Sequence, residues 1–436
     1  MSQQQKNGSV IAIITMFFLY AMIAFVTNLG APIGVIWKGQ PEIGGSNVLG
    51  IMGNFMNFFA YLFMGIPAGK MLTKYGYKKT ALIGIAFGFV GVLIQFLSGF
   101  AHGIPGFCVY LLGAFISGFS VCILNTVVNP MLNLLGGGGN RGNQLNMIGG
   151  TLNSLAGTMT PMLVGALIGT VTADTKMADV NLVMYIAMTV FALAFIALLF
   201  IPIQDPEMGR VTSETKFEHS PWSFRHLKLG VIAIFVYVGV EVGIPGGLNF
   251  FLSDAENGAG SMFANAATVG GAVAAMYWLL MLIGRLCSSS IASKVSARTL
   301  MLITTSVGMI LILAAMLTPK TATVSMPLFN IMEGSFSTVV VPASALLLVL
   351  CGLCTSVMWT SIFNLSTEGL GKYTAQASGI FMMMVVGGGV LPVIQNFFAD
   401  LIGYMPSYFI YLLGMAYMFY YALIGSKNVN KDIPVD

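Results

Sequence analysis

Charged residues are scarce in this sequence. Only 8% of its 436 residues are Asp, Glu, Lys or Arg, whereas soluble domains carry about 25%. Hydrophobic residues make up 57% of the chain, and the mean hydropathy is +0.87. This composition excludes an ordinary soluble domain and indicates a protein that crosses a bilayer several times. The 52 glycines agree with close helix packing in lipid, where small residues let backbones approach.

Several site types lack support. The net charge is only +4 and there is no long basic run, which argues against nucleic-acid binding. His102, His219 and His226 fall in expected loops, which argues against a His-based metal site. Cys351 and Cys354 have the spacing of a redox or metal half-site, but within an expected membrane helix they read more simply as two buried thiols on one face. We expect no metal, no cofactor and no enzymatic activity, because no nucleophile–base pair appears.

Long apolar runs dominate what is present. A helix needs about 20 apolar residues to cross a bilayer. Twelve segments approach or exceed this length: 9–37, 47–68, 79–100, 106–134, 144–171, 182–203, 228–252, 261–287, 299–317, 338–364, 374–401 and 406–425. The most polar stretch, 204–227, divides them into two groups of six. We therefore expect an all-α integral membrane protein with twelve transmembrane helices in two pseudo-symmetric bundles, residues 1–203 and 228–436, joined by a cytoplasmic linker.

The basic residues set the expected orientation. With the N-terminus in the cytoplasm, only Lys38, Lys176 and Lys320 lie outside, and the other sixteen of the 19 basic residues lie inside or at inner helix ends. The opposite orientation would reverse this ratio. Residues 1–8 are polar, and the apolar run after them is too long for a signal-peptide core, so we expect a retained first span. The prediction is a bacterial inner-membrane protein with both termini in the cytoplasm.

One carboxylate falls within an expected span. Glu241 lies near the middle of the apolar stretch 229–252. A carboxylate at this depth costs several kcal/mol unless it is neutralised, paired or hydrated, so it is a candidate functional residue. The simpler alternative is a protonated acid in a helix contact.

The other polar residues inside spans are mostly amides, often near helix-breaking prolines and glycines. They include Asn28, Asn125, Asn129, Asn153, Gln395 and Asn396. Amides offer both donors and acceptors, as a polyhydroxy solute requires. Trp278 and Trp359 could lie against the apolar face of a sugar ring. Each amide alone is best explained by an interhelical hydrogen bond. Together with Glu241, converging on one cavity, they predict a sugar site.

A glycine-rich basic loop joins the second and third segments at residues 65–79. It resembles the Gly–Asp–Arg–Gly–Arg signature of the major facilitator superfamily, with Thr73 where the signature usually has Asp. Arg285, after Gly284, is a partial counterpart in the second half. We assign gating roles to Gly69, Lys74, Gly76, Arg285, Glu368 and Lys372. The alternative is that these residues only determine on which side of the membrane the loops lie and how deep the helices sit in the bilayer.

Five stretches resemble the fucose–galactose–glucose:proton symporter family of that superfamily: 17–32, 124–130, 151–154, 237–242 and 356–400. The second reads Leu-Asn-Thr-Val-Val-Asn-Pro, which is similar to the family's Glu-Thr-Ala-Ala-Asn-Pro motif. The fourth reads Tyr-Val-Gly-Val-Glu-Val, which is similar to its helix-seven Tyr-Val-Gly-Ala-Glu. The resemblance covers nearly the whole chain and implies the two-bundle transporter fold.

The departures from the family concern its acidic residues. Fucose permeases of this family carry an Asp in helix one and a Glu in helix four, which serve proton coupling and sugar binding. Asn28 and Asn125 stand at those positions here. An amide keeps hydrogen bonds to a sugar but cannot exchange a proton. Glu241 is then the remaining candidate for coupling.

These observations predict a secondary active transporter that imports a monosaccharide or sugar derivative by alternating access, coupled to H⁺ or Na⁺ through Glu241. An uncoupled uniporter and a non-transporting sugar-sensing receptor remain as alternatives. A drug or lipid exporter would need a more apolar cavity than this amide set suggests. The expected partners are a small sugar and the lipid bilayer, and the expected state is a monomer.

Overall fold

The structure is a computed structural model, and it describes residues 3–135, 139–172, 174–201, 219–291, 295–331, 333–370, 373–430 and 432–433. Most of the expected linker, 204–227, lies outside these residues, as does Lys372.

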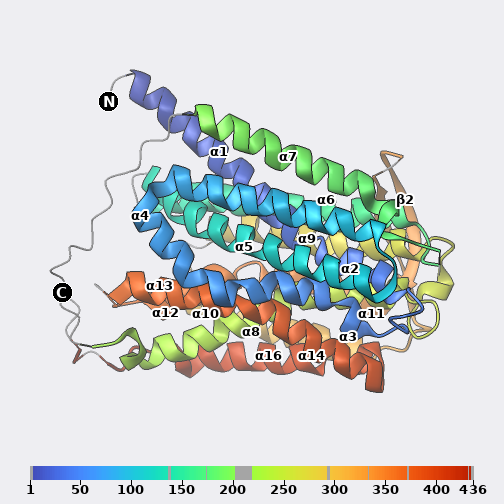
Figure 1. The fold of residues 1–436 in the computed structure, drawn as a ribbon. Coiled ribbons are helices and arrows are strands. Elements are labelled where there is room, and N and C mark those ends of the chain that lie inside the picture. The colour runs from blue at the N-terminus through green and yellow to red at the C-terminus, as the bar shows by residue number, and fades with distance from the viewer. Residues whose placement is uncertain are drawn as a thin grey trace.

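Long helices make up nearly all of the described chain (Figure 1). Those of the N-terminal half are α1 (Gln3–Thr27), α2 (Gly30–Lys38), α3 (Asn47–Gly50), α4 (Met52–Leu97), α5 (Gly103–Leu135), α6 (Gly139–Ile168) and α7 (Asn181–Phe200). Those of the C-terminal half are α8 (Arg225–Ser253), α9 (Ala266–Ile291), α10 (Ala297–Leu317), α11 (Ala343–Thr355), α12 (Met358–Thr367), α13 (Thr374–Met383), α14 (Gly387–Ile402), α15 (Tyr404–Ser407) and α16 (Phe409–Tyr420). Short 3₁₀ turns are η1 (Ser98–Phe100), η2 (Met177–Val180), η3 (Pro221–Ser223), η4 (Gly260–Met262) and η6 (Met384–Val386), and a π-helical turn, η7 (Tyr421–Gly425), follows α16.

Eleven helical stretches of the described chain are long and apolar enough to cross a membrane. The second expected segment, 47–68, is not among these eleven; it falls in α3 and the first part of α4. Gly76 divides α4, because its backbone is non-helical with φ 77°, a region that only glycine enters readily. The chain reverses there, as Figure 1 shows. The structure thus accommodates the twelve-helix arrangement that the sequence predicts.

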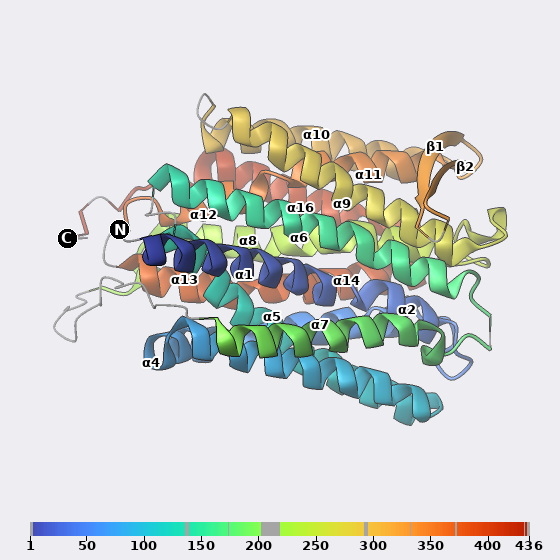
Figure 2. The same ribbon diagram turned by 90° about the horizontal axis from the view of Figure 1, so that it is seen from above.

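The helices pack as two groups that meet along a seam. Within the N-terminal half, α4 packs on α5 and α7, and α1 packs on α5 and α6. Within the C-terminal half, α8 packs on α9, α12, α14 and α16. Between the halves, α6 packs along α9, α4 lies against α13 and α14, and α2 lies against α8. Any site between the halves is therefore walled by these helices (Figure 2).

Two of the membrane-crossing segments are interrupted where the sequence predicts broken helices. The first segment breaks at Asn28, two residues before α2 begins, and Pro32 lies in the first turn of α2. The eleventh segment is divided into α13, η6 and α14, and α14 begins with three glycines, Gly387 to Gly389. Such breaks free backbone groups that must face protein or a wet cavity.

A two-stranded antiparallel hairpin was not expected. Strands β1 (Thr323–Asn330) and β2 (Ser335–Pro342) pair along their whole length, with Gly334 at φ 64° in the turn. The expected tenth span begins at residue 338, which is wrong, because Thr338 to Pro342 belong to β2 and the helix starts at Ala343. The run Thr-Val-Val-Val is apolar but β-branched, and such residues favour strands.

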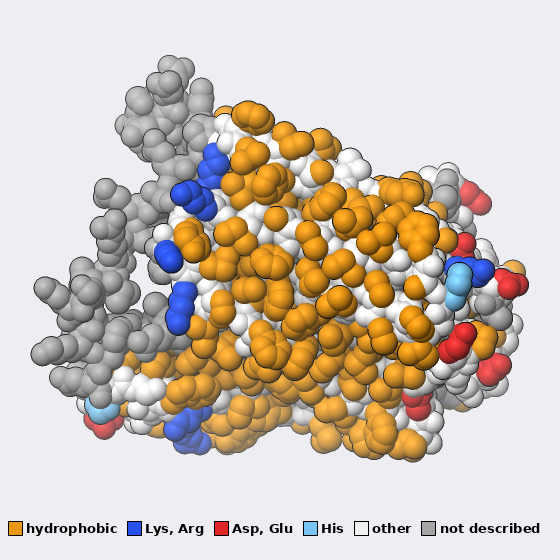
Figure 3. All heavy atoms as spheres, viewed as in Figure 1, with side chains coloured by type: hydrophobic (Ala, Val, Ile, Leu, Met, Phe, Trp, Pro, Cys, Tyr) orange, Lys and Arg blue, Asp and Glu red, His pale blue; other side chains and the backbone are white. Residues whose placement is uncertain are grey.

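The hairpin marks one end of the molecule, which we call the hairpin face; the opposite end, where the two chain ends lie, is the termini face (Figure 1). Apolar side chains form a broad belt between the two faces (Figure 3). In the same view, Lys and Arg side chains gather at the termini face and Asp and Glu side chains at the hairpin face. This polarity matches the charge asymmetry on which the expected orientation rests.

Candidate functional site

A small cavity lies between the two halves, nearer to the hairpin face. Its volume is about 20 Å³, room for one water molecule, so a larger ligand enters only when the two halves move apart. Its lining residues come from both halves: Thr27, Asn28, Ala31, Pro32, Asn54 and Pro161 from the first, and Val242, Pro245, Gly246, Asn249, Ala274 and Trp278 from the second. None of the twelve carries a formal charge, which favours an uncharged ligand.

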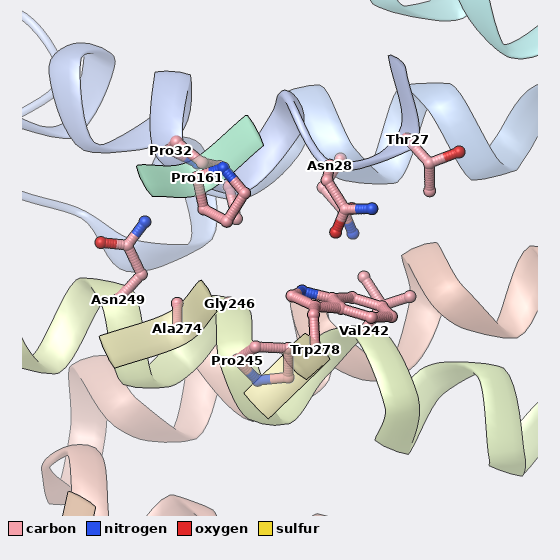
Figure 4. Close-up of a pocket in the computed structure, with 12 residues that line it drawn as sticks. Thr27, Asn28, Pro32, Pro161, Val242, Pro245, Gly246, Asn249, Ala274 and Trp278 are labelled. Atoms are coloured by element: carbon pink, nitrogen blue, oxygen red, sulfur yellow. The ribbon is translucent and has the colours of Figure 1, made fainter. Parts of the chain in front are cut away.

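Asn28 and Trp278 lie opposite each other across this cavity (Figure 4). The break after α1 places the Asn28 amide at the cavity wall, where its Nδ2 donates to the carbonyl of Ala24 at 2.9 Å. Gly157 of α6 lies between the two side chains, since a Cβ built on it would be 3.2 Å from Asn28 Nδ2 and 3.5 Å from Trp278 Cδ2. The missing side chain keeps space open between an amide and an aromatic face.

Two further amides line the cavity and are not among the predicted residues. Asn54 of α4 is buried, and its Nδ2 donates to the carbonyl of Gly388 at 2.9 Å, across the two halves. Asn249 of α8 is also buried, and its Oδ1 accepts a hydrogen bond from Ser253 at 3.2 Å. Both are amides within apolar spans, the same signal that selects Asn28. Asn249 also follows a Pro-Gly-Gly run in the stretch that contains Glu241.

Three predicted amides of the first half form a separate cluster around two tyrosines. The Tyr20 hydroxyl donates to Asn129 Oδ1, and Asn153 Nδ2 donates to the Tyr20 carbonyl at 3.1 Å. Asn125 Nδ2 donates to the Tyr61 hydroxyl at 2.8 Å. These amides are half-buried and do not belong to the cavity lining. The three amides therefore lie close together, but apart from Asn28 and its cavity.

The cluster adjoins an ion pair that the sequence did not predict. Arg285 of α9 lies with its Nη2 3.3 Å from Glu241 Oε1. Its Nη1 donates to the carbonyl of Gly150 at 2.9 Å and to Ser154 Oγ at 2.8 Å, both on α6 of the other half. The side chains of Arg285 and Glu241 are 21% and 12% exposed. Glu241 is therefore paired, and its partner also holds the two halves together.

The ion pair is positioned along the same helix faces as the cavity. Arg285 lies seven residues after Trp278 on α9, which is two helical turns and the same face. Glu241 lies four residues, about one helical turn, before Pro245, which lines the cavity from the same face of α8. The sequence predicts Arg285 as a gate within an inner loop motif. Its position inside α9 beside Glu241 could not be foreseen from the Gly-Arg pattern, because the pairing depends on how α8 and α9 pack.

Gln395, Asn396 and Trp359 lie elsewhere. Gln395 and Asn396 are fully buried within the C-terminal half; Gln395 Nε2 donates to Ser407 Oγ at 2.7 Å, and Asn396 Nδ2 donates to Gln395 Oε1 at 3.0 Å. Trp359 packs against Tyr237 and Phe381. None of the three lines the cavity. Their assignment to a common sugar site has no support in this arrangement.

Two predictions about single side chains have opposite outcomes. The buried positions of Cys351 and Cys354 are confirmed. His226 was expected in a loop, which is wrong: it lies buried in α8, with Nε2 3.0 Å from the carbonyl of Glu368. The expected span begins only at residue 228, so it omits this first turn of the helix.

A known family matches most of the chain. The family model described as Major Facilitator Superfamily matches residues 8–393. The chain belongs to the major facilitator superfamily. It is a multi-pass membrane transporter and not an enzyme, as the sequence predicts.

Curated proteins similar to this superfamily member align with most or nearly all of its length. A "Glucose/galactose transporter" of Brucella abortus is 29% identical over 98% of this chain and 96% of its own length. A "Putative glucose/galactose transporter" of Helicobacter pylori is 27% identical over 97% of this chain and 99% of its own. The "L-fucose-proton symporter" of Escherichia coli is 23% identical over 80% of this chain and 78% of its own.

Solved structures of the superfamily share the fold. FucP in its outward conformation aligns with a TM-score of 0.66 at 19% identity, covering 97% of this chain and 100% of FucP. A bacterial homologue of the human lysosomal transporter Spinster, inward-facing and occupied, aligns with a TM-score of 0.61 at 13% identity, covering 98% of this chain and 96% of its own. These likenesses establish the twelve-helix transporter fold.

Gly69, Lys74, Gly76 and Glu368 of the predicted gating residues lie at the termini face of this superfamily protein. Arg285 instead lies inside α9 and pairs with Glu241, and Lys372 lies outside the described residues. Gly76 forms the turn within α4 described above, Gly69 has open space beside it, and Lys74 lies over the ring of Tyr75 at 5.2 Å. The carbonyl of Glu368 contacts His226.

Proposed function

We propose that this transporter carries an uncharged monosaccharide or a close derivative through the cavity between its halves. The observation that carries the proposal is the pairing of the Asn28 amide with the Trp278 indole across an uncharged cavity. An indole face suits the apolar C–H face of a sugar ring, and an amide can both donate to and accept from hydroxyl groups. Asn54 and Asn249 supply further amides in the same wall.

The similar proteins support the choice of a sugar. The Brucella and Helicobacter relatives are described as glucose/galactose transporters, and the Escherichia relative as a fucose–proton symporter. An aldohexose or a deoxy-hexose is therefore the substrate class to test first.

The proposed membrane orientation follows from the charge asymmetry. We place the hairpin face outside and both termini in the cytoplasm of a bacterial inner membrane, since basic residues favour the inner side. Impermeant thiol labelling of sealed cells tests this placement. Val429 and Ser337 are both exposed, the first near the C-terminal end and the second on β2. A Ser337→Cys variant should label from outside and a Val429→Cys variant should not; the reverse pattern inverts the orientation.

Glu241 and Arg285 are the proposed coupling pair. A charged Glu241 holds Arg285 Nη2, while Arg285 Nη1 reaches Gly150 and Ser154 of the other half. Neutralising Glu241, by a proton that enters with the sugar from the hairpin face or by a bound Na⁺, removes the main attraction on the guanidinium. The bridge between the halves then changes as the site loads or empties. Asn129 and Asn153, beside Tyr20, border this bridge and are proposed to receive the sugar as it leaves the cavity.

Uncoupled uniport is a second candidate, and one observation favours it. Arg285 already compensates the Glu241 charge in this conformation, so the carboxylate need not exchange an ion. A sugar-sensing receptor would use the same cavity without transport. We propose a monomeric transporter, because the two halves of a single chain enclose the cavity between them.

Uptake into proteoliposomes of the purified protein separates these functions. A panel of labelled hexoses, deoxy-hexoses, a uronate and a pentose is offered with no gradient, with a pH gradient and with a Na⁺ gradient. Proteoliposomes without protein serve as the control. Accumulation of a neutral hexose above the outside concentration with one of the gradients supports coupled import. Equilibration alone identifies a uniporter, and binding without entry identifies a receptor. Failure to bind any sugar in the panel contradicts the proposal.

A further inference from the structure

The two halves are tied together by charge at the hairpin face. Lys38, the last residue of α2, lies with its Nζ 2.5 Å from Oδ2 of Asp254, which directly follows α8. Lys38 Nζ also donates to the hydroxyl of Tyr404, at the start of α15. That hydroxyl lies 2.8 Å from Asp254 Oδ2 and 2.7 Å from Asn47 Oδ1. Among the described residues, Lys38–Asp254 is the one ion pair that joins the halves.

A second carboxylate makes a parallel tie. Asp400, near the end of α14, accepts hydrogen bonds from the backbone amide of Asn47 at 2.9 Å and from its side-chain Nδ2 at 2.7 Å. It also accepts from the amide of Val48 at 3.3 Å and from Ser46 Oγ at 3.2 Å. The C-terminal half therefore caps the first turn of α3, which belongs to the N-terminal half. Free amides at a helix start favour a negative partner.

An aromatic ring lies beneath the ion pair. Phe250 of α8 is buried, and a Cβ built on Gly34 or on Gly50 would lie 3.1 Å from its ring atoms. The same Cβ on Gly50 would lie 3.0 Å from Lys38 Cβ. Phe250 directly follows Asn249, which lines the cavity. The ring thus fills the space between two glycines of the other half, between the cavity and the hairpin face.

We propose that Lys38, Asp254, Tyr404 and Asp400, with Phe250 below them, form a gate that closes the cavity toward the hairpin face. We call this set the clasp. Every tie in it except Asp254–Tyr404 crosses from one half to the other, so the halves cannot separate at this face while it is intact. The side chains of Lys38 and Asp254 are only 11% and 9% exposed. Removing one partner leaves the other charge poorly solvated, which is costly, so the pair must part and rehydrate together when the gate opens.

The proposal rests on the alternating-access part of the proposed function, but its test does not use sugar. The reporter is Ala31→Cys, a small cavity-lining position, in a chain whose five native cysteines are replaced by alanine. An impermeant, positively charged methanethiosulfonate reagent is applied separately to sealed cells and to inverted vesicles, and the modification rate is measured on each side. Lys38→Met removes the charge but keeps an apolar stem over Phe250.

A gate predicts a side-specific response. Modification from the hairpin face should rise at least tenfold in the Lys38→Met and Asp254→Asn variants. It should fall back toward the parent rate in the charge-reversed pair, Lys38→Asp with Asp254→Lys. Phe250→Ala should also raise it, by removing the ring without touching the charges.

The matched control is Lys320→Ala. Lys320 is also at the hairpin face, but its Nζ donates to the carbonyls of Asn257 and Gly258 and lies over the ring of Phe251, all in its own half. Its loss should leave the rate within twofold of the parent. Unchanged rates in Lys38→Met, Asp254→Asn and Phe250→Ala would overturn the gate. A rise in accessibility in a protein that transports no sugar of the panel would leave the gate standing and reject the sugar proposal alone.

Discussion

Arg285 lies between a carboxylate of its own half and a helix of the other. Its Nη2 is 3.3 Å from Glu241 Oε1, and its Nη1 donates to the Gly150 carbonyl and to Ser154 Oγ on α6. The Arg285 guanidinium therefore links the charge state of Glu241 to α6, at the interface along which the two halves move. Its forked donors can hold both partners at once. This contact gives the proposed coupling a physical route that an isolated acid would lack.

The two tryptophans proposed for sugar stacking should behave differently. Trp278 lines the cavity, whereas Trp359 packs on Tyr237 and Phe381. Trp278→Leu should weaken sugar binding about tenfold or more, the equivalent of about 1.4 kcal/mol of lost contact. Trp359→Leu should leave affinity within about threefold of the parent. Calorimetry or equilibrium binding of labelled sugar compares them. Equal losses in both would place the site elsewhere.

Gly157 offers a steric test of the same cavity. A leucine there would occupy the space between the Asn28 amide and the Trp278 ring. Sugar uptake in Gly157→Leu should fall at least tenfold, while the purified protein remains monodisperse. The control is Gly379→Leu, at a helical glycine of α13 with open space beside it, which should transport normally. Parent-like uptake in Gly157→Leu would show that the sugar does not pass between these residues.

The clasp should not respond to physiological changes of pH. Burial alone would raise the pKa of Asp254, but the Lys38 charge and hydrogen bonds from Lys38, Asn257 and Tyr404 outweigh it and lower the pKa to about 2. An acid with a depressed pKa contributes stability above its unfolded value of about 3.9 and loses it only as the pH falls through about 2. Labelling of Ala31→Cys from the hairpin face should stay within about twofold between pH 5 and 8. A tenfold rise at pH 5 would mean that another group titrates there.

The lengths of the apolar runs and the positions of the proline, glycine and amide residues within them predicted the helices well. The break at Asn28 ahead of Pro32, the glycine turn at Gly76 and the interrupted eleventh segment were all recognisable, because each depends on local backbone chemistry. The hairpin was missed because residues 338–342 are as apolar as a membrane helix. Hydropathy alone does not distinguish a β-branched strand beside a span from the span itself.

The site was predictable in kind and only partly in position. Intramembrane amides, one acid and two tryptophans are selected by residue type, and Asn28 and Trp278 do line the cavity. Gln395 illustrates the limit: its amide donates to Ser407 inside one half, and nothing in the local sequence separates that role from a ligand contact. The ion-pair partners of Glu241 and Lys38 lie 44 and 216 residues away along the chain, so only the packed fold reveals them.

Glu241→Gln tests the coupling mechanism most directly. The amide keeps the shape of the side chain but removes the charge that holds Arg285. In proteoliposomes loaded with unlabelled sugar, we predict that exchange with labelled sugar persists in this variant, while accumulation against a gradient is lost under both pH and Na⁺ gradients. The parent protein, measured in parallel, should accumulate sugar with one of the two ions. If Glu241→Gln concentrates sugar as well as the parent does, Glu241 is not the coupling residue and the proposed mechanism is wrong.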